Sequence, residues 1–254
     1  MSVADVAIGI AIGFVSGVLS GLFGVGGGIV MTPGIQVLLG APPIVALATP
    51  LPVIFPTALT GALTYRRRGE IDMRAAAWLI GPGVVGAVIG AWLTGSIDTR
   101  LLLLVTAVLL AWQAIAILRK GERRTPERPA TAPILGAIGA LAGVVSGLLG
   151  IGGGLVIVPL LAGWLGMPLK RALGTSLLAI VALVVPGTVV HAALGHLDLT
   201  IGLALVVGAV PGARLGAALA LGARERTLRL VVGSGLLVIA IAYAIQQTAE
   251  MLDR

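Results

Sequence analysis

The chain of 254 residues is 58% hydrophobic and only 11% charged, with a formal net charge of +7. A soluble globular domain carries about 25% charged residues, so this composition excludes a water-facing surface and predicts a protein surrounded by lipid. Cysteine is absent and aromatics make up 4%, which excludes disulfides, thiolate metal ligands and a base-stacking surface for nucleic acid.

The first half predicts five apolar segments in chain order. A long helix over residues 3–22 meets a glycine run at 24–28, and a shorter segment follows over 29–39. Three further spans are expected over 44–65, 73–94 and 99–118. At twelve residues or fewer the second segment is too short to cross a bilayer. The first pair is therefore either two passes or a re-entrant hairpin.

The second half repeats the first at an offset of 126 residues. Gly24-Val25-Gly26-Gly27-Gly28 falls on Gly150-Ile151-Gly152-Gly153-Gly154, Pro33 on Pro159 and Asp72 on Asp198. The corresponding segments are 133–149, 155–165, 172–191, 199–221 and 228–245. A match of this length at one offset indicates duplication. We expect a first transmembrane repeat (1–118), a basic linker (119–132) and a second transmembrane repeat (133–254).

The charges of the loops predict that the two repeats are inverted. Arg66, Arg67 and Arg68 follow the third segment, whereas the equivalent loop at 195–198 has no Lys or Arg. The bias reverses at two more loops, where the cations are in the second half: Lys170, Arg171, Arg224, Arg226 and Arg229. Basic loops face the cytoplasm, so the linker is expected inside and the N-terminus outside. Opposite bias in the two halves is typical of inverted repeats.

The expected fold is therefore an all-α integral membrane protein. It has two inverted repeats of about four to five helical segments each, roughly eight to ten in total. Each repeat starts with a glycine-broken short helix or a re-entrant hairpin.

The glycine runs are the strongest candidate for a binding site. Irregular backbone within a membrane must be buried in protein or line a cavity, and amides that open a helix bind anions. Two such breaks across a pseudo-two-fold axis would form one site near the midplane. The alternatives are a tight helix crossing or a hinge. The candidate residues are Gly24, Gly26, Gly27, Gly28, Gly150, Gly152, Gly153 and Gly154.

Hydroxyl groups and a cation add to this candidate site. The candidate hydroxyls are those of Thr49, which precedes Pro50, and of Thr175 and Ser176, which follow Gly174 at the equivalent place in the second half. Each hydroxyl can bind substrate or form a hydrogen bond to its own helix. Arg214 is the most interior charge, either a counter-charge for the anion or a side chain that snorkels to the interface.

His191 is a candidate for proton coupling, with interfacial packing as its alternative. Asp72 and Asp198 are expected to cap helices. No catalytic constellation or metal-ligand cluster is apparent in the sequence, so neither an enzyme nor a cofactor is predicted.

The motifs together resemble the TauE/SafE family of sulfite and organosulfonate exporters, also called the 4-toluene sulfonate uptake permease family. The resemblance rests on the duplicated glycine motif with its spaced proline, Gly174-Thr175-Ser176, the His191…Gly195…Asp198 stretch and Gly212-Ala213-Arg214-Leu215-Gly216. It covers nearly the whole chain. The first half departs from it, with Ala48-Thr49-Pro50 where the family often repeats a Thr-Ser pair.

The resemblance implies a transporter for small sulfur-containing anions in the bacterial inner membrane. We expect alternating access by rocking of one repeat against the other, with H+ or Na+ as the candidate coupling ion and a homo-oligomer as a candidate assembly. The expected partners are an anionic substrate and the lipid bilayer, with no nucleic acid. A passive anion channel and a non-transporting membrane subunit are the alternatives.

Overall fold

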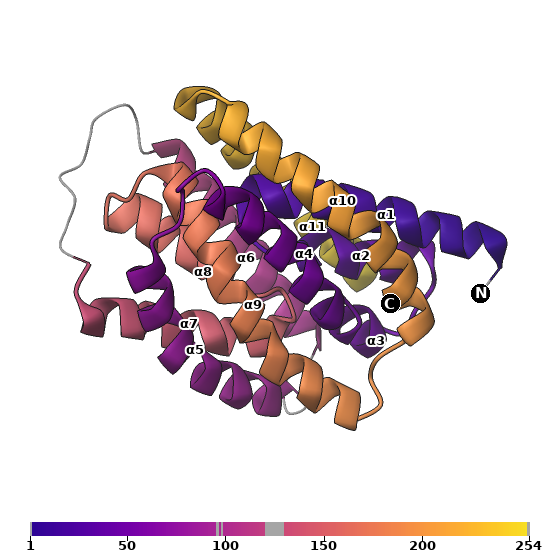
Figure 1. The fold of residues 1–254 in the computed structure, drawn as a ribbon. Helices are drawn as coiled ribbons and strands as arrows, with labels where there is room; N and C mark the ends of the chain where they lie inside the picture. The colour runs from indigo at the N-terminus through magenta and orange to yellow at the C-terminus, as the bar shows by residue number, and fades with distance from the viewer. Residues whose placement is uncertain (1, 95–96, 98, 120–129, 253–254) are drawn as a thin grey trace.

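The computed structural model describes residues 2–94, 97, 99–119 and 130–252, and every regular element in these residues is a helix (Figure 1). The elements in order are α1 (Val3–Phe23), α2 (Gly28–Leu38), α3 (Pro43–Ala48), α4 (Pro50–Arg66), α5 (Met73–Thr94), α6 (Thr99–Arg119), α7 (Ala132–Leu149), α8 (Gly154–Val158), the π-helical η1 (Pro159–Trp164), α9 (Leu169–Ala193), α10 (Leu199–Gly222) and α11 (Glu225–Leu252).

The lengths of these helices match a lipid bilayer. Among the described residues, six helices are long and apolar enough to cross a membrane: Val3–Phe23, Pro43–Arg66, Met73–Thr94, Ala132–Leu149, Leu169–Ala193 and Leu199–Gly222. By contrast, the 11 residues of α2 rise only about 16 Å, roughly half of the hydrocarbon core. The predicted all-α integral membrane fold is confirmed.

The third predicted span, 44–65, is observed as Pro43–Arg66, with a local irregularity at Thr49, whose φ of −58° and ψ of −32° remain helical. α3 ends at Ala48 and α4 begins at Pro50, because proline lacks a backbone N–H and its ring displaces the carbonyl four residues earlier. Ser176 is the residue of the second half that is equivalent to Pro50, and α9 runs unbroken from Leu169 to Ala193. The predicted segments 172–191 and 228–245 also begin earlier than expected, at Leu169 and Glu225.

The helices recur at the same offset of 126 residues as the sequence. Helix starts pair as Gly28 with Gly154, Pro43 with Leu169, Met73 with Leu199 and Thr99 with Glu225. Glycines with positive φ pair in the same way, Gly24 with Gly150, Gly27 with Gly153 and Gly69 with Gly195. The inversion of the halves and their division into two domains at the linker stay predictions, since residues 120–129 of that linker lie outside the described residues.

The first helix of each half packs against a helix of the other half. α1 packs along α10 and α7 packs along α5, while α4 meets α9 and α6 meets α11. Small residues bring these backbones together: a methyl group added to Gly13 would collide with the carbonyl oxygen of Leu205, and one added to Gly139 with that of Leu79. Each half is therefore tied to the other by its most closely packed helix.

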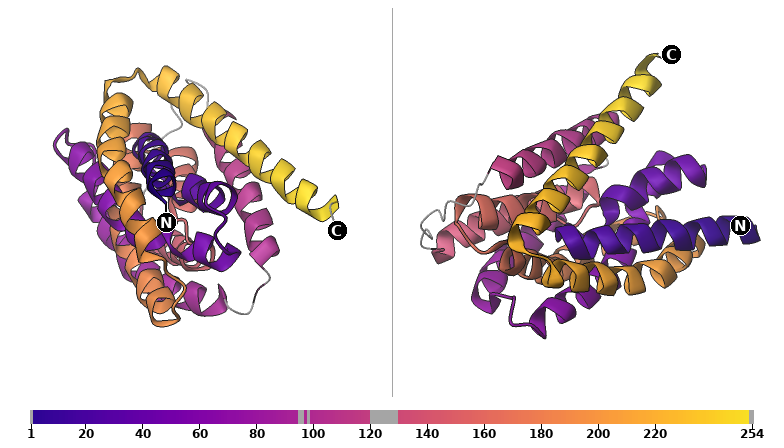
Figure 2. Two further views of the ribbon diagram at one scale, coloured as in Figure 1. Left: turned by 90° about the vertical axis from the view of Figure 1, so that its right-hand side faces the viewer. Right: turned by 90° about the horizontal axis from the view of Figure 1, so that it is seen from above.

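α1 and α7 enter the molecule from opposite ends. In Figure 1 the N-terminus of α1 lies at the right, whereas α7 begins at the left after the grey trace. The helices α6 and α11 lie side by side at the outside of the bundle in both views of Figure 2. The first helix of each half thus ends at its glycine run in the interior.

Candidate functional site

Each glycine run ends one helix and starts the next. Gly24 (φ 68°) and Gly150 (φ 66°) are left-handed and close α1 and α7 by donating their N–H groups to Ser20 O and Ser146 O. Gly27 (φ 83°) then precedes α2 and Gly153 (φ 77°) precedes α8. Only glycine adopts these positive φ values without steric cost, so the runs fix two matching breaks in the helices.

The structure brings the two runs into direct contact. A methyl group added to Gly28 would lie 2.9 Å from Gly150 O, and one added to Gly26 would lie 2.9 Å from Ile151 O. In the other direction, a methyl group on Gly154 would collide with Gly24 O. The predicted meeting of the two runs is therefore present in the geometry. Substrate binding there stays a prediction.

Apolar side chains of the long helices α4 and α9 pack against both runs. Ile54 of α4 and Ile180 of α9 are equivalent residues, and both are fully buried. A methyl group on Gly26 would lie 3.1 Å from Ile54 Cγ2, and one on Gly152 would lie 2.9 Å from Ile180 Cγ2. The runs therefore lie in a low-dielectric environment, where hydrogen bonds to an anion are strong.

Four buried hydroxyls near the runs were missed in the sequence. Ser16, Ser20 and Ser146 are 0% exposed and Thr32 is 3% exposed, and none of them has a hydrogen-bond partner within the described part of the chain. Buried polar groups without a partner are rare in native structures. Elsewhere, Thr57 and Thr106 donate to the carbonyl four residues earlier, at 2.6 and 2.9 Å.

Two of these serines lie beside the first run, and Thr32 follows it in sequence. A methyl group on Gly27 would lie 3.1 Å from Ser16 O and 3.3 Å from Ser20 Cβ, so the run covers these serines of α1. Thr32 follows on the first turns of α2. The spacing of Ser16 and Ser20, four residues apart beside the glycines of α1, is the signal that could have found them.

The predicted hydroxyls Thr49, Thr175 and Ser176 fasten the two halves together. Thr175 Oγ1 accepts the N–H of Asp72 at 2.9 Å, and Thr49 Oγ1 accepts the N–H of Asp198 at 3.1 Å. Ser176 Oγ donates to Gly24 O at 2.8 Å, directly at the first run. Each of these bonds crosses from one half to the other.

Asp72 and Asp198 precede α5 and α10. Asp198 Oδ1 accepts the N–H groups of Thr200 and Ile201 at 2.9 and 3.0 Å, and Asp72 Oδ1 accepts that of Ala75 at 2.9 Å. The predicted capping role is confirmed. These carboxylates stabilise helix starts.

The structure does not bring Arg214 to the glycine runs. Gly212 and Gly216, two residues to either side, face α1, where added methyl groups would collide with Phe14 O and Val18 O. Residues two apart lie on opposite sides of a helix, and Arg214 is exposed. Arg214 therefore lies on the exposed face of α10, and both its snorkelling and its role as a counter-charge stay predictions.

His191 and His196 form a pair at one end of α9. The chain turns at Gly195 (φ 69°), and the N–H of His196 donates to His191 O at 3.0 Å, which folds the two rings together. Their Nδ1 atoms lie 3.1 Å apart. His191 is 1% exposed and its Nε2 has no partner among the described residues.

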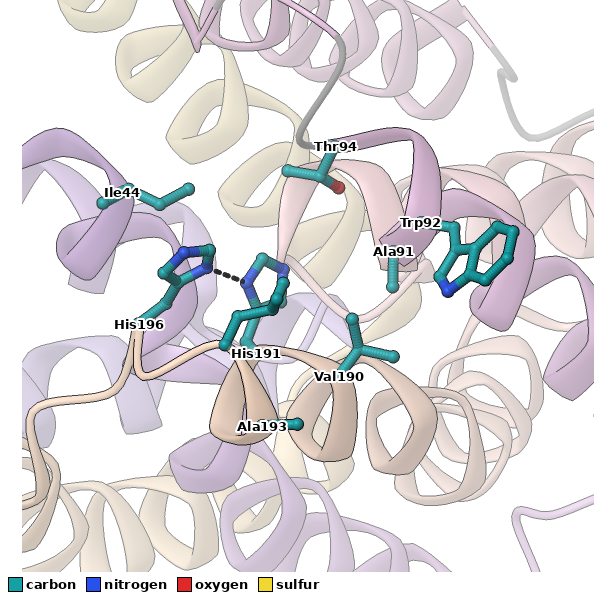
Figure 3. A pocket seen from close by; sticks show the side chains of 9 residues that line it. Ile44, Ala91, Trp92, Thr94, Val190, His191, Ala193 and His196 are labelled. Atoms are coloured by element: carbon teal, nitrogen blue, oxygen red, sulfur yellow. Dashed lines mark hydrogen bonds between the residues drawn. The ribbon is translucent and has the colours of Figure 1, made fainter.

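The pair borders a cavity of about 440 Å³. Figure 3 shows the two rings facing each other, with Thr94 and Trp92 of α5 across from them. The lining residues are Ile44, Ala91, Trp92, Thr94, Val190, His191, Ala193, Leu194 and His196. The volume lies within the range of about 300–1,000 Å³ typical of small-molecule sites.

The equivalent position at the other end of the molecule is filled. Tyr65 replaces His191, is 0% exposed, and donates its hydroxyl to Gly21 O at 3.0 Å. The carbonyl oxygen equivalent to Gly21 O is Gly147 O, which accepts a hydrogen bond from Thr94 Oγ1 at 3.1 Å rather than one from His191. Within the described part of the chain, Nε2 of His191 thus has no bond that corresponds to the one made by Tyr65.

Comparison with known proteins places the chain among membrane transporters. The sequence model of the family described as "Sulfite exporter TauE/SafE" matches residues 9–243. A "Probable membrane transporter protein" of Xylella fastidiosa (strain 9a5c) is 32% identical, covering 95% of each chain. The "Probable membrane transporter protein YunE" of Bacillus subtilis is 30% identical, over 91% of this chain and 94% of its own. No solved structure matches.

Proposed function

Since the chain belongs to the TauE/SafE sulfite exporter family and is thus a multi-pass membrane transporter rather than an enzyme, we propose that it carries a small sulfur-containing anion. The substrate class is an organosulfonate, sulfite or a related oxyanion. The anion binds at the contact between the two glycine runs, Gly24 to Gly28 and Gly150 to Gly154.

The observation that carries this proposal is the group of unpartnered hydroxyls. Ser16, Ser20, Ser146 and Thr32 are buried without hydrogen-bond partners among the described residues. A buried hydroxyl without a partner costs about 1–3 kcal/mol. An oxyanion with several acceptor oxygens would satisfy such donors, and the stored cost then favours binding.

The start of α2 supports an anion at the first run. The helix dipole places partial positive charge at this end, although the N–H groups of Val30 and Met31 already donate to Gly27 O at 3.2 and 3.3 Å. Gly27 precedes this end and has no side chain to cover it. Ser176, which is bonded to Gly24 O, holds α9 against the same run.

Thr49 and Thr175 are proposed to position the site. Their oxygens already accept backbone N–H groups of the opposite half, although each hydroxyl proton stays available as a donor. His191 is proposed to couple proton movement to transport, with H+ favoured over Na+ as the coupling ion because the pair can take up a proton.

Alternating access is proposed with moving units that differ from the two repeats. Rocking of one repeat against the other would separate α1 from α10 and α7 from α5, the most closely packed pairs. We therefore assign α1 with α10 to one unit and α5 with α7 to the other. The bonds of Thr49 with Asp198 and of Thr175 with Asp72 hold the starts of α10 and α5 to neighbouring helices, and the bond from Ser176 joins α9 to Gly24 at the end of α1.

The orientation follows from the basic loops. Arg66, Arg67 and Arg68 are proposed to face the cytoplasm of a bacterial inner membrane, together with the linker, and the N-terminus lies outside. This orientation places the His191 end outside and the Tyr65 end inside.

Thr32→Val tests the site, with Thr57→Val as its matched control. Both are buried threonines that valine replaces with little change of shape, but Thr57 bonds to Val53 O, whereas Thr32 has no partner among the described residues. We expect Thr32→Val to raise the thermal stability of the empty protein. It should also weaken anion binding roughly tenfold to hundredfold, since a hydrogen bond to a charged group contributes about 1.5–3 kcal/mol.

The measurements are thermal unfolding and uptake into proteoliposomes across methanesulfonate, isethionate, taurine and sulfite. Thr57→Val should lose stability slightly and keep its affinity. Equal affinity in the two variants would refute the site, and uptake that never saturates would favour the channel. Absence of any uptake or binding by the purified protein would favour a non-transporting subunit and sink the proposed function.

A further inference from the structure

The cavity beside His191 and His196 is separate from the glycine runs and carries its own chemistry. A hydrogen bond between two imidazole Nδ1 atoms needs one protonated and one bare nitrogen. If His191 accepts this bond, its neutral ring carries its proton on Nε2, which is buried and has no partner among the described residues, in a side chain that borders the cavity. If the pair takes up a further proton, His191 can donate from both nitrogens.

The remaining lining selects an organic anion. Ile44, Val190 and Leu194 supply apolar surface, and Trp92 supplies an aromatic ring. The two imidazoles are the only titratable groups among the described residues that line the cavity. Asp198, two residues beyond His196, already caps α10 through Oδ1. A ligand with one anionic head and a hydrocarbon body matches this arrangement.

The other end of the molecule carries different residues at the two positions of the pair. Tyr65 occupies the position of His191 with its hydroxyl bonded to Gly21 O, and Glu70 occupies that of His196. The histidine pair is therefore present at one end only, on the face that the loop charges assign to the outside.

We propose that the His191–His196 cavity is a second binding site, which takes an organic sulfonate monoanion at the outer face. His191 Nε2–H donates to a sulfonate oxygen, the organic group lies against Trp92 and Leu194, and the pair takes up a proton with the anion. The ligand class rests on the proposed function, whereas the site rests on the geometry of the pair.

Histidine NMR tests the proposal directly because His191 and His196 are the only histidines of the chain. Full-length protein with 15N-labelled histidine and no histidine tag, in nanodiscs, would give signals from these two rings alone. We expect benzenesulfonate to shift the Nε2 signal of His191, with sulfate at equal ionic strength as the control. A ligand that prefers the protonated pair moves its titration midpoint to higher pH, by about 1–2 pH units for roughly tenfold to hundredfold coupling.

A mirrored variant supplies the control within the protein. His191→Tyr combined with Thr94→Ala recreates the arrangement of Tyr65 and Ala220 at the other end, and should fill the cavity while keeping the fold. We expect it to abolish the response of His196 to benzenesulfonate. His191→Asn keeps a neutral donor and should retain weak binding without the shift in midpoint.

The outcomes separate this site from the proposed function. Unchanged histidine signals at saturating benzenesulfonate, with uptake intact, would overturn the second site alone. Equal shifts with sulfate would overturn its selectivity for organic anions. An unchanged response in the mirrored variant would place the ligand elsewhere, and loss of all anion binding and uptake in the unmodified protein would reject the proposed function as well.

Discussion

The two glycine runs have the same backbone but different surroundings. Both close a helix with a left-handed glycine and open the next after a second one. Ser16 and Ser20 lie beside the first run and Thr32 follows it in sequence, whereas the equivalent positions around the second are Ala142, Ser146 and Val158. The first run also starts the 11-residue α2, while α8 has five residues before the π-helical η1.

The two halves therefore share the helix break at the glycine run and differ in the polar side chains around it. The shared backbone brings the two runs into contact at the centre of the molecule. Hydrogen-bond donors are concentrated on one side of that contact. An anion there should depend mostly on the first run, with the second run acting as its apolar wall.

The largest expected effect is on substitution of the matched glycines Gly27 and Gly153. Alanine at either position is strained because φ is 83° and 77°, at a cost of about 1–3 kcal/mol. An added methyl group meets Ser16 O at 3.1 Å in the first case and Ala142 O at 2.6 Å in the second. Gly153→Ala should therefore lower the melting temperature more than Gly27→Ala.

Anion affinity should follow the opposite order. Gly27→Ala displaces Ser16 and Ser20, so we expect it to weaken binding more, although it destabilises the protein less. Thermal unfolding and sulfonate binding on both purified variants measure the two quantities. If affinity simply followed stability, the polar side of the contact would not be the anion site.

A smaller effect is expected from the equivalent serines Ser20 and Ser146. Both hydroxyls are buried and unpartnered within the described residues. A methyl group added to Gly27 would lie 3.3 Å from Ser20 Cβ, whereas the nearest atoms to one added to Gly153 belong to Ala142 and Leu183. Ser20→Ala should lower affinity roughly tenfold, as expected for about 1.4 kcal/mol. Ser146→Ala should change affinity much less, and equal losses in the two variants would show a symmetric site.

Much of the fold could be predicted from the sequence because apolar length and caps set the helices. The span 73–94 is observed as Met73–Thr94, after the capping residue Asp72. The irregularity at Thr49 was not predicted, since prolines within apolar segments do not all disturb a helix. Pro56 and Pro82 lie inside α4 and α5, and the tertiary contacts decide which proline starts a new helix.

The candidate site was predictable in its backbone and less so in its side chains. Glycines that allow positive φ identify the breaks, but Ser16 and Ser20 look like ordinary helix serines, which commonly bond to their own backbone. Arg214 was assigned to the site because charge in an apolar span suggests function. Arg214 lies two residues from Gly212 and Gly216 and therefore on the opposite face of α10. That face can be assigned only once it is known that the two glycines contact α1.

The smallest expected effect tests which helices move together. Gly9 of α1 and Ala204 of α10 are in contact, with an added methyl group on Gly9 lying 2.9 Å from Ala204 Cβ. Because the chain has no cysteine, Gly9→Cys with Ala204→Cys would form a single disulfide without background thiols. The short separation calls for a small backbone adjustment, since disulfides prefer a Cβ–Cβ distance of about 3.5–4.5 Å.

If α1 and α10 move as one unit, this disulfide should leave the transport rate nearly unchanged. Uptake into proteoliposomes before and after reduction, with cross-linking followed by alkylation and mass spectrometry, gives the comparison in one sample. Inhibition that reduction reverses would instead require α1 to separate from α10 in each cycle. The first repeat would then move as a body, and the close glycine contacts at Gly13 and Gly17 would have to break and reform during transport.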